Sequence, residues 1–427
     1  MREPTPILLP AKVRIPKPAE AVPARLLLIT SATSYQTGRY LSAAKRLQFD
    51  VCLGCDQPLI SAALVPGRSL HLDFGSPQSA VDRILEQASK QGFDALLGVD
   101  EPSCGIAALA ARALHLDHNP PAAVAAAHDK YLFRQRLAQT GLPCPDFRLL
   151  RPADDNERIA EQIDYPCVLK PLRLNASRGV MRADNPEEFL AAAIRIDALL
   201  AGSAGQPREI LIEQFIPGSE FALEGLLENG RLRMLALFDK PLPLDGPLFE
   251  ESIYVTPSRA SAPLQQSLLA TTACTCAGLG LRQGPIHAEL RSNAEGVWLI
   301  ELATRSIGGR CSAALRFGNG AALEELILRN ALGMPAAHLP REPGASAVMM
   351  IPIPAPGRLA AVHGLERARQ VPGITSVRID IAIGSELVPL PEGDRYLGFI
   401  FARGATANQA VRSVKHAHSL LHFAIEP

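Results

Sequence analysis

Hydrophobic and polar positions alternate along the first quarter of the chain in the pattern of a parallel α/β domain. Short apolar runs at residues 25–30, 50–55 and 93–99 predict strands. Periodic patterns at residues 37–48, 79–91 and 103–115 predict the helices that follow them. Strands that alternate with helices form parallel sheets. The turn after the first strand, TSATSYQTGRY, lacks the glycines of a dinucleotide-binding loop, so we do not expect NAD there.

The rest of the pattern divides the chain further. Residues 1–24 are rich in proline, and a proline break near Asn119 ends the first domain, 25–119. Residues 120–335 mix helix and strand patterns, with a capped helix start at 185–188 and a hairpin turn at 228–230. Residues 336–427 contain short β segments. We therefore predict an α/β multidomain protein with a parallel α/β domain, a central α+β domain and a small, mostly β C-terminal domain.

A second predicted hairpin places two glutamates opposite each other. In GPIHAELRSNAEGVWLIELATRSIGG, strands at 286–291 and 297–303 with a turn centred on Glu295 pair Glu289 with Glu301. Facing carboxylates repel unless a proton or a cation lies between them, and Mg²⁺ prefers oxygen ligands. The alternative is a solvated face with both glutamates paired to arginines. The core face would hold Ile286, Ala288, Leu290, Trp298, Ile300 and Leu302, and the other face His287, Glu289, Arg291, Glu301 and Arg305.

Two other segments have nucleotide-binding chemistry. Lys170 ends an apolar strand, and the small, polar loop 175–180, with Ser177, Arg178 and Gly179, could fold over phosphates. In EILIEQFIPGSEFALEGLL, Glu213 and Glu220 interrupt a strand pattern, as an adenine edge and ribose hydroxyls would require. Lysines that end strands often only extend to water, and both acids could be solvated.

Composition excludes several classes of protein. The 427 residues are 47% hydrophobic and 20% charged, which suits a globular chain with several domains. Zero formal net charge and the lack of a run of about 20 apolar residues argue against nucleic-acid and membrane partners. Eight scattered cysteines suit a reducing cytoplasm, with Cys52 and Cys55 as core residues and a redox or zinc pair as the alternative.

Together these motifs resemble the ATP-grasp superfamily, in particular carboxylate–amine ligases of the L-amino-acid ligase type. The likeness runs from about residue 25 to the C-terminus, and it rests on an ordered series of motifs. The series is HDK at Lys130, VLKP at Lys170, SRGV at 177–180, IEQFIPGSEF at 212–221, then HAEL and IELATR.

The resemblance implies a role for each matching residue. Lys130, Lys170, the Ser177–Gly179 loop and Lys240 would contact ATP phosphates, and Arg305 would stabilise phosphates and an activated carboxyl group. Glu289 and Glu301 would bind Mg²⁺, or Mn²⁺ in its place. The adenine-contacting segment would be Glu213, Gln214, Phe215 and Ile216, with Glu220 on the ribose. The family commonly has an asparagine ligand where this chain has Ala303, which cannot coordinate a metal.

The activity implied by the resemblance is ADP-forming ligation of a small-molecule carboxylate to an amine through an acyl phosphate. We expect a cytoplasmic enzyme, and a homodimer would be compatible with the resemblance. Glu251 and Arg310 are candidates for the amino and carboxylate ends of an amino-acid substrate, and His287 is a candidate substrate contact; each could instead be structural or solvated. Two alternatives stay open. One is an ATP-grasp carboxylase or nucleotide-precursor ligase, and the other is a nucleotide-binding regulator that has lost turnover at Ala303.

Overall fold

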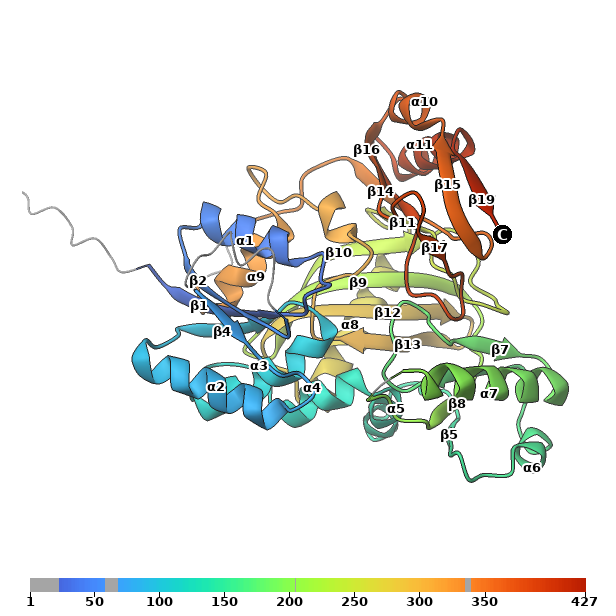
Figure 1. Ribbon diagram of the computed structural model, residues 1–427, viewed down its shortest axis with the longest axis horizontal. Coiled ribbons are helices and arrows are strands. Elements are labelled where there is room, and N and C mark those ends of the chain that lie inside the picture. The colour runs from blue at the N-terminus through green and yellow to red at the C-terminus, as the bar shows by residue number, and fades with distance from the viewer. Residues whose placement is uncertain (1–22, 58–67, 204, 335–338) are drawn as a thin grey trace, which may run out of the picture.

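The computed structural model describes residues 23–57, 68–203, 205–334 and 339–427. Its parts are a parallel α/β layer, a long antiparallel sheet and two smaller sheets (Figure 1). The predicted fold class is confirmed. Almost all of the predicted proline-rich segment 1–24, and the expected boundary between residues 335 and 336, lie outside the described residues.

The N-terminal layer is the parallel sheet that the alternating pattern predicts. The strands run in the order β3-β2-β1-β4, and each neighbouring pair is parallel. All six residues of β1 are buried, because helices and the large sheet cover both faces. The three-residue strand β3 was not predicted, since SLH is too short to give a period. The elements are β1 (Arg25–Thr30), α1 (Thr37–Arg46), β2 (Asp50–Cys55), β3 (Ser69–His71), α2 (Pro77–Lys90), β4 (Ala95–Gly98) and α3 (Glu101–Ala113).

The large sheet has eight strands in the order β13-β12-β9-β10-β11-β14-β18-β16. One face packs on α4, α5 and α8, and the other face meets β1, α1 and α9 in a shared core. These elements are α4 (Pro121–His128), α5 (Lys130–Ala138), β9 (Ser219–Glu228), β10 (Arg231–Lys240), β11 (Ile253–Thr256), α8 (Ala262–Leu279), β12 (Gly284–Asn293), β13 (Gly296–Ala303), η2 (Cys311–Ala314), α9 (Leu323–Ala331), β14 (Ala345–Ile351), β16 (Ile374–Ile379) and β18 (Gly398–Gly404).

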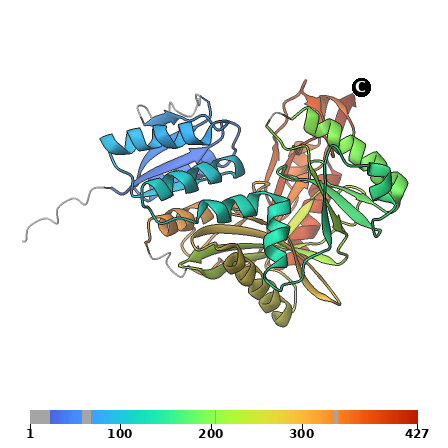
Figure 2. The same cartoon turned by 90° about the horizontal axis from the view of Figure 1, so that it is seen from below.

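A separate four-stranded sheet, β5-β8-β6-β7, packs on α6 and α7 beside the large sheet. We call it the lid sheet. Seen from below, α7 and the parallel layer lie at opposite sides of the molecule (Figure 2). The predicted cap of α7 is present, since the Asn185 side chain accepts a 3.0 Å hydrogen bond from the Glu188 N–H. The elements are β5 (Phe147–Leu150), α6 (Asn156–Ala160), β6 (Cys167–Pro171), β7 (Met181–Ala183), α7 (Pro186–Ala201) and β8 (Ile210–Gln214).

The C-terminal residues extend the large sheet as well as forming a sheet of their own. Strands β14, β18 and β16 continue it beyond β11, and β17, β15 and β19 make a three-stranded sheet. The C-terminal part is mostly β, as expected, with two helices against its sheets. The additional elements are β15 (Gly357–His363), α10 (Leu365–Arg369), β17 (Glu386–Leu387), α11 (Ala407–Ser419) and β19 (His422–Glu426).

The glutamate hairpin has the predicted central pair but not all of the predicted face. Glu289 pairs with Glu301, and Leu290 then pairs with Leu299, so Ile300 is an extra residue in a β-bulge. On the turn side of the bulge, the residues of β13 that face the core are therefore the opposite of those predicted. The expectation that Trp298 and Ile300 lie in the core is therefore wrong: both are partly exposed, and their neighbours Val297 and Leu299 are buried instead. A bulge leaves no signature in the hydrophobic pattern of this segment.

Candidate active site

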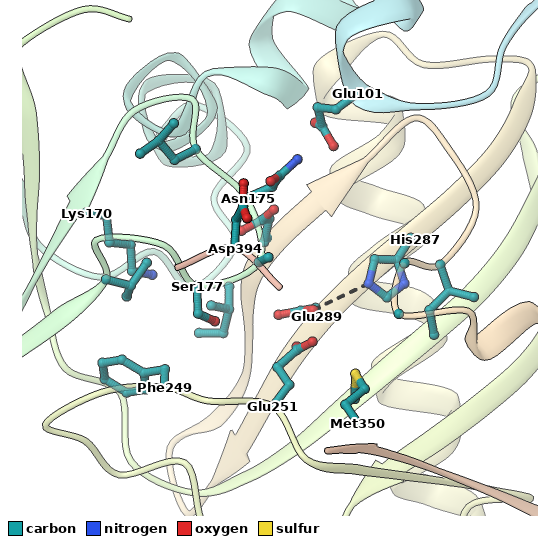
Figure 3. Close-up of a pocket in the computed structure, with 18 of the residues that line it drawn as sticks. Glu101, Lys170, Asn175, Ser177, Phe249, Glu251, His287, Glu289, Met350 and Asp394 are labelled. Carbon is teal, nitrogen blue, oxygen red and sulfur yellow. Dashed lines mark hydrogen bonds and ion pairs between the residues drawn. The ribbon is translucent and has the colours of Figure 1, made fainter. Parts of the chain in front are cut away.

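A cavity of about 510 Å³ lies where the lid sheet, the large sheet, the N-terminal layer and a C-terminal segment meet (Figure 3). It brings together most of the side chains that the sequence singles out. Those on its wall are Lys130, Lys170, Ser177, Glu213, Gln214, Phe215, Ile216, Glu220, Glu251, His287, Glu289, Glu301 and Arg305. Four other candidates, Arg178, Gly179, Lys240 and Arg310, lie nearby without lining it.

The two lysines at the lid side are held in place by different groups. Lys170 forms an ion pair with the buried Glu213, which also accepts a 2.8 Å bond from Arg134. Burial opposes ionisation of Glu213, but Arg134 and Lys170 lower its pKa to about 2. The Lys130 ammonium donates to the Leu174 carbonyl at 2.7 Å and lies 3.7 Å from Glu301. Both positive charges therefore have fixed positions at the cavity wall.

The two carboxylate oxygens of Glu213 thus bind two cations, Arg134 and Lys170. The following residues, 214–216, line the cavity wall, although the N–H groups of Gln214 and Phe215 donate to the carbonyls of Asp146 and Pro166. Arg134, which also donates to the carbonyls of Leu299 and Ile300 at 2.9 Å, is a functional neighbour that the sequence did not suggest. One arginine among the mixed residues of a short helix gives no local signal of its burial.

Lys240 lies at the centre of three carboxylates. Its ammonium is 2.6 Å from Glu220, 2.7 Å from Glu251 and 3.3 Å from Glu289, and oxygens of the three glutamates lie within 4.8 Å of one another. Burial would raise the pKa of Glu289, but Lys240 and His287 bring it well below its ordinary range. Burial raises the pKa of Glu251 to about 7, despite Lys240. Lys240 therefore neutralises these acids and does not point a free ammonium at the cavity.

His287 is a charged residue held by Glu224. Its Nδ1 lies 2.6 Å from Glu224 and its Nε2 3.4 Å from Glu289, the contact drawn in Figure 3. Burial disfavours the imidazolium, but Glu224 raises the pKa of His287 to about 9. Glu224 also accepts the N–H of Ile307 at 3.0 Å, and the sequence did not single out this residue. Glu224 therefore favours the imidazolium form of His287 beside Glu289.

The two arginines after the hairpin have separate positions. Arg305 lines the cavity and donates to Glu101, at the start of α3, at 2.9 Å. Arg310 does not line it; its guanidinium donates to Asp380 at 2.7 Å and lies 5.0 Å from the centre of the Tyr35 ring. Arg310 joins three parts of the chain behind the cavity wall, so direct contact with substrate is not supported.

The predicted phosphate loop is attached to the C-terminal part of the chain. Ala176 and Ser177 have left-handed φ angles of 54° and 56°, which turn the loop toward the cavity. The Arg178 side chain donates to the Glu392 carbonyl at 2.8 Å, and Arg195 of α7 binds the Glu392 carboxylate through two bonds of 2.5 and 2.9 Å. Segment 389–396 was not predicted as part of the site, although Asp394 points into the cavity (Figure 3).

The oxygen-rich wall fits a hard divalent cation. Glu289 and Glu301 lie on paired positions of one hairpin and face the same cavity. Among the residues that the structure describes, one group of three acids lies close enough together to hold a metal ion: Glu220, Glu251 and Glu289. Glu289 therefore belongs both to this cluster and to the predicted pair. The Lys240 ammonium already lies among the three acids of the cluster, so the pair Glu289 and Glu301, which has only oxygen donors, is the set that suits Mg²⁺ or Mn²⁺. Ala303, at the position where the family commonly has an asparagine ligand, is buried, and its methyl side chain cannot coordinate a metal.

Two family models match the chain. Residues 163–314 match the ATP-grasp domain, and residues 349–426 match the L-amino acid ligase C-terminal domain 2. The first span includes the lid sheet and the glutamate hairpin, and the second includes segment 389–396. No helix within the described ranges combines the length and the apolar character needed to cross a membrane.

Known proteins resemble the chain over different lengths. The crystal structure of an L-amino acid ligase from Bacillus licheniformis is similar at 25% identity and a TM-score of 0.78, over 95% of this chain and 99% of that one. Dapdiamide A synthase from Enterobacter agglomerans is 30% identical over 43% of this chain and 44% of its own length. The uncharacterized protein y4rH from Sinorhizobium fredii is 25% identical over 72% and 63%. The matches to these two curated relatives cover less than two thirds of their lengths.

Proposed function

Because this chain contains an ATP-grasp domain followed by an L-amino acid ligase C-terminal domain, we propose that it is an ATP-dependent, ADP-forming carboxylate–amine ligase. Its substrates would be an amino acid or another small carboxylate, and an amino acid or another amine. The observation that carries the proposal is the meeting of Lys130, Lys170 and Arg305 with Glu289 and Glu301 in one cavity. Three cations and two metal-type acids suit the polyphosphate of ATP.

In the proposed reaction, a substrate carboxylate oxygen attacks the γ-phosphorus of ATP, the bond to the β-phosphate oxygen breaks, and ADP leaves. The amine then attacks the carbonyl carbon of the acyl phosphate, loses a proton and displaces phosphate. Lys130, Lys170 and Arg305 would neutralise the negative charge that moves during both steps. Glu289 and Glu301 would hold Mg²⁺ or Mn²⁺, which supplies further positive charge to the phosphates.

The remaining candidates have supporting roles in this proposal. The Ser177–Gly179 loop, attached to segment 389–396, would exclude water that could hydrolyse the acyl phosphate. Backbone groups of 214–216 would contact adenine. Glu251 would accept the substrate ammonium, and the His287 cation would face a substrate carboxylate. Arg310 would position the neighbouring backbone of Gly308 and Gly309, which lines the cavity.

Location and assembly follow from the same proposal. All eight cysteines are free, although Cys52 and Cys55 lie on the same strand, β2, and this supports a reducing compartment such as the cytoplasm. Partners would be small molecules, and a homodimer is the assembly that we would test by sedimentation.

The test is release of ADP and phosphate from Mg-ATP with single amino acids and amino-acid pairs, with mass spectrometry of the products. We expect ADP release that depends on a pair and yields the matching dipeptide or amide. Bicarbonate-dependent release would favour the carboxylase alternative. Tight ATP binding without turnover across amino acids, amines and bicarbonate would contradict the ligase proposal and favour a regulator. Glu301→Gln is the matched control for contaminating ATPase activity.

A further inference from the structure

A second cavity, of about 60 Å³, lies away from the active-site cavity, where the segment after η2, the start of β14 and the end of β18 meet. The two cavities share no lining residue. We call the second one the arginine pocket. Its ionisable and hydroxyl side chains are Arg316, Arg341, Glu342, Ser346 and Arg403.

Carboxylates do not balance the positive charge around this pocket. Glu342 lies 3.6 Å from Arg403. The nearby Glu324 is already engaged by Arg39, through bonds of 2.6 and 3.2 Å. Four guanidinium groups, including those of Arg316 and Arg341, therefore share two carboxylates, which leaves a local excess of positive charge.

Arg316 and Arg341 carry that excess. Within the described ranges, neither has a carboxylate at ion-pair distance. Each donates one hydrogen bond to a backbone carbonyl, Arg316 to Leu315 at 2.8 Å and Arg341 to Gly344 at 2.9 Å. A guanidinium has several N–H donors in a planar fork, so most of the donors of both side chains are available.

Partial burial makes the uncompensated charge costly. Burial, followed by the positive charges of Arg39 and Arg403, lowers the pKa of Arg316. Burial and Arg403 likewise lower the pKa of Arg341. Both shifts mean that the surroundings oppose the charged form, so a bound anion would relieve the repulsion.

A hydroxyl group adds a donor on the same wall. Ser346 of β14 pairs with Arg403 of β18, so the two side chains share a sheet face. Ser346 is only 4% exposed. Val348 and Met350 continue that face into the apolar core. A serine at this position interrupts a hydrophobic pattern where the arginines converge.

We propose that the arginine pocket binds a small oxyanion of the inorganic phosphate type, held by Arg316, Arg341 and Arg403 with a hydrogen bond from Ser346. Guanidinium forks match the oxygens of a phosphate group, and the cavity has room for a single such group, which excludes a nucleotide as the full occupant. The proposal is independent of the proposed ligase activity, because the pocket is separate from the active-site cavity.

The test is calorimetric titration of the full chain with inorganic phosphate, at constant ionic strength and with chloride as the control anion. The variants are Arg316→Ala/Arg341→Ala, the matched exposed arginine variant Arg412→Ala, and Lys170→Ala to remove phosphate binding in the active-site cavity. We expect roughly 100-fold weaker binding in the double variant, since two charge-assisted contacts are lost. Arg412→Ala and Lys170→Ala should retain the wild-type affinity for this site.

Three outcomes would overturn the proposal. The first is absence of phosphate binding. The second is phosphate binding that Lys170→Ala abolishes and the double variant retains. The third is a dimer that forms with increasing protein concentration, is disrupted in the double variant and binds no phosphate. The last result would mean that acidic residues of a second copy are the counterions. Thermal unfolding without phosphate shows whether the double variant is folded, and Arg316→Lys, which keeps the charge but loses the fork, should bind with intermediate affinity.

Discussion

Replacement of Lys240 by methionine should strongly destabilise the fold at alkaline pH. The side chain of Lys240 is 3% exposed, and it is the cation that Glu220, Glu251 and Glu289 share. Methionine keeps much of the length and removes the charge, so three largely buried carboxylates would lose their common counterion. Loss of one partner from a buried ion pair costs about 3–5 kcal/mol, and we expect a loss of this size in the free energy of unfolding at pH 8.

The loss should shrink as the pH falls. The pKa of Glu251 is about 7 in the folded wild type, above the value of about 4.3 for an unfolded glutamate. Lys240 lowers this pKa, so the variant should have a higher value still. At pH values between the unfolded pKa of about 4.3 and the raised folded pKa, the folded variant binds more protons than the unfolded chain. The stability of the variant therefore rises as the pH falls through this range. A protonated carboxyl needs no counterion.

Urea denaturation of the wild type and Lys240→Met at pH 8 and pH 5.5, followed by circular dichroism, measures both effects. Lys90→Met is the matched control, because its ion pair with Glu86 on α2 is exposed, and it should change stability little. Adding Glu251→Gln to Lys240→Met should recover part of the loss, since the double variant has one buried negative charge fewer. A loss below about 1 kcal/mol at pH 8, or an equal loss at both pH values, would refute this account of the cluster.

Three further predictions concern the proposed activity. Glu301→Gln should abolish Mg²⁺-dependent ADP release with the circular dichroism spectrum unchanged, whereas Glu295→Gln at the exposed hairpin turn should retain it; equal activity in both would contradict the metal assignment. Arg195→Ala removes the two bonds that attach α7 to Glu392 of segment 389–396, so it should raise KM for ATP several-fold and increase ADP release without amine. Arg208→Ala breaks an ion pair with Asp197 of α7 and should change neither KM nor ADP release. Ala303→Asn should lower the Mg²⁺ concentration for half-maximal rate; no change would mean that residue 303 does not reach the ion.

Sequence reasoning succeeded where a local pattern determines the structure. The first two strands have the predicted bounds. Glu289 pairs with Glu301 as predicted, but the turn is not centred on Glu295, since Asn293 pairs with Gly296, and the bulge at Ile300 produces the pair. Sequence reasoning failed where one extra residue in a strand, or one contact between residues far apart in the chain, determines the structure. The bulge at Ile300 reverses which side chains of β13 face the core and leaves the composition unchanged, so the pattern wrongly predicts Trp298 in the core.

The ion-pair partners show the same limit. Lys170 and Glu213 were both singled out, but Arg134, which completes their network, lies 79 residues from Glu213 along the chain. The resemblance predicts a phosphate contact for Lys240, but the sequence gives no sign of its three glutamate partners. Its three glutamates come from β9, β12 and the loop before β11, and only the folded sheet brings them together.

The continuity of the large sheet has a consequence for the order in which the protein is made. Strand β11 pairs with β14, β14 pairs with β18, and residues 394–396, just before β18, form part of the cavity wall. A ribosome must therefore synthesise nearly the whole chain before the wall can close. An incomplete nascent chain would contain most of the proposed nucleotide contacts but not the complete cavity, so the proposed reaction should not begin during translation. Exchange of the C-terminal part between relatives would also require a matched sheet edge at β11.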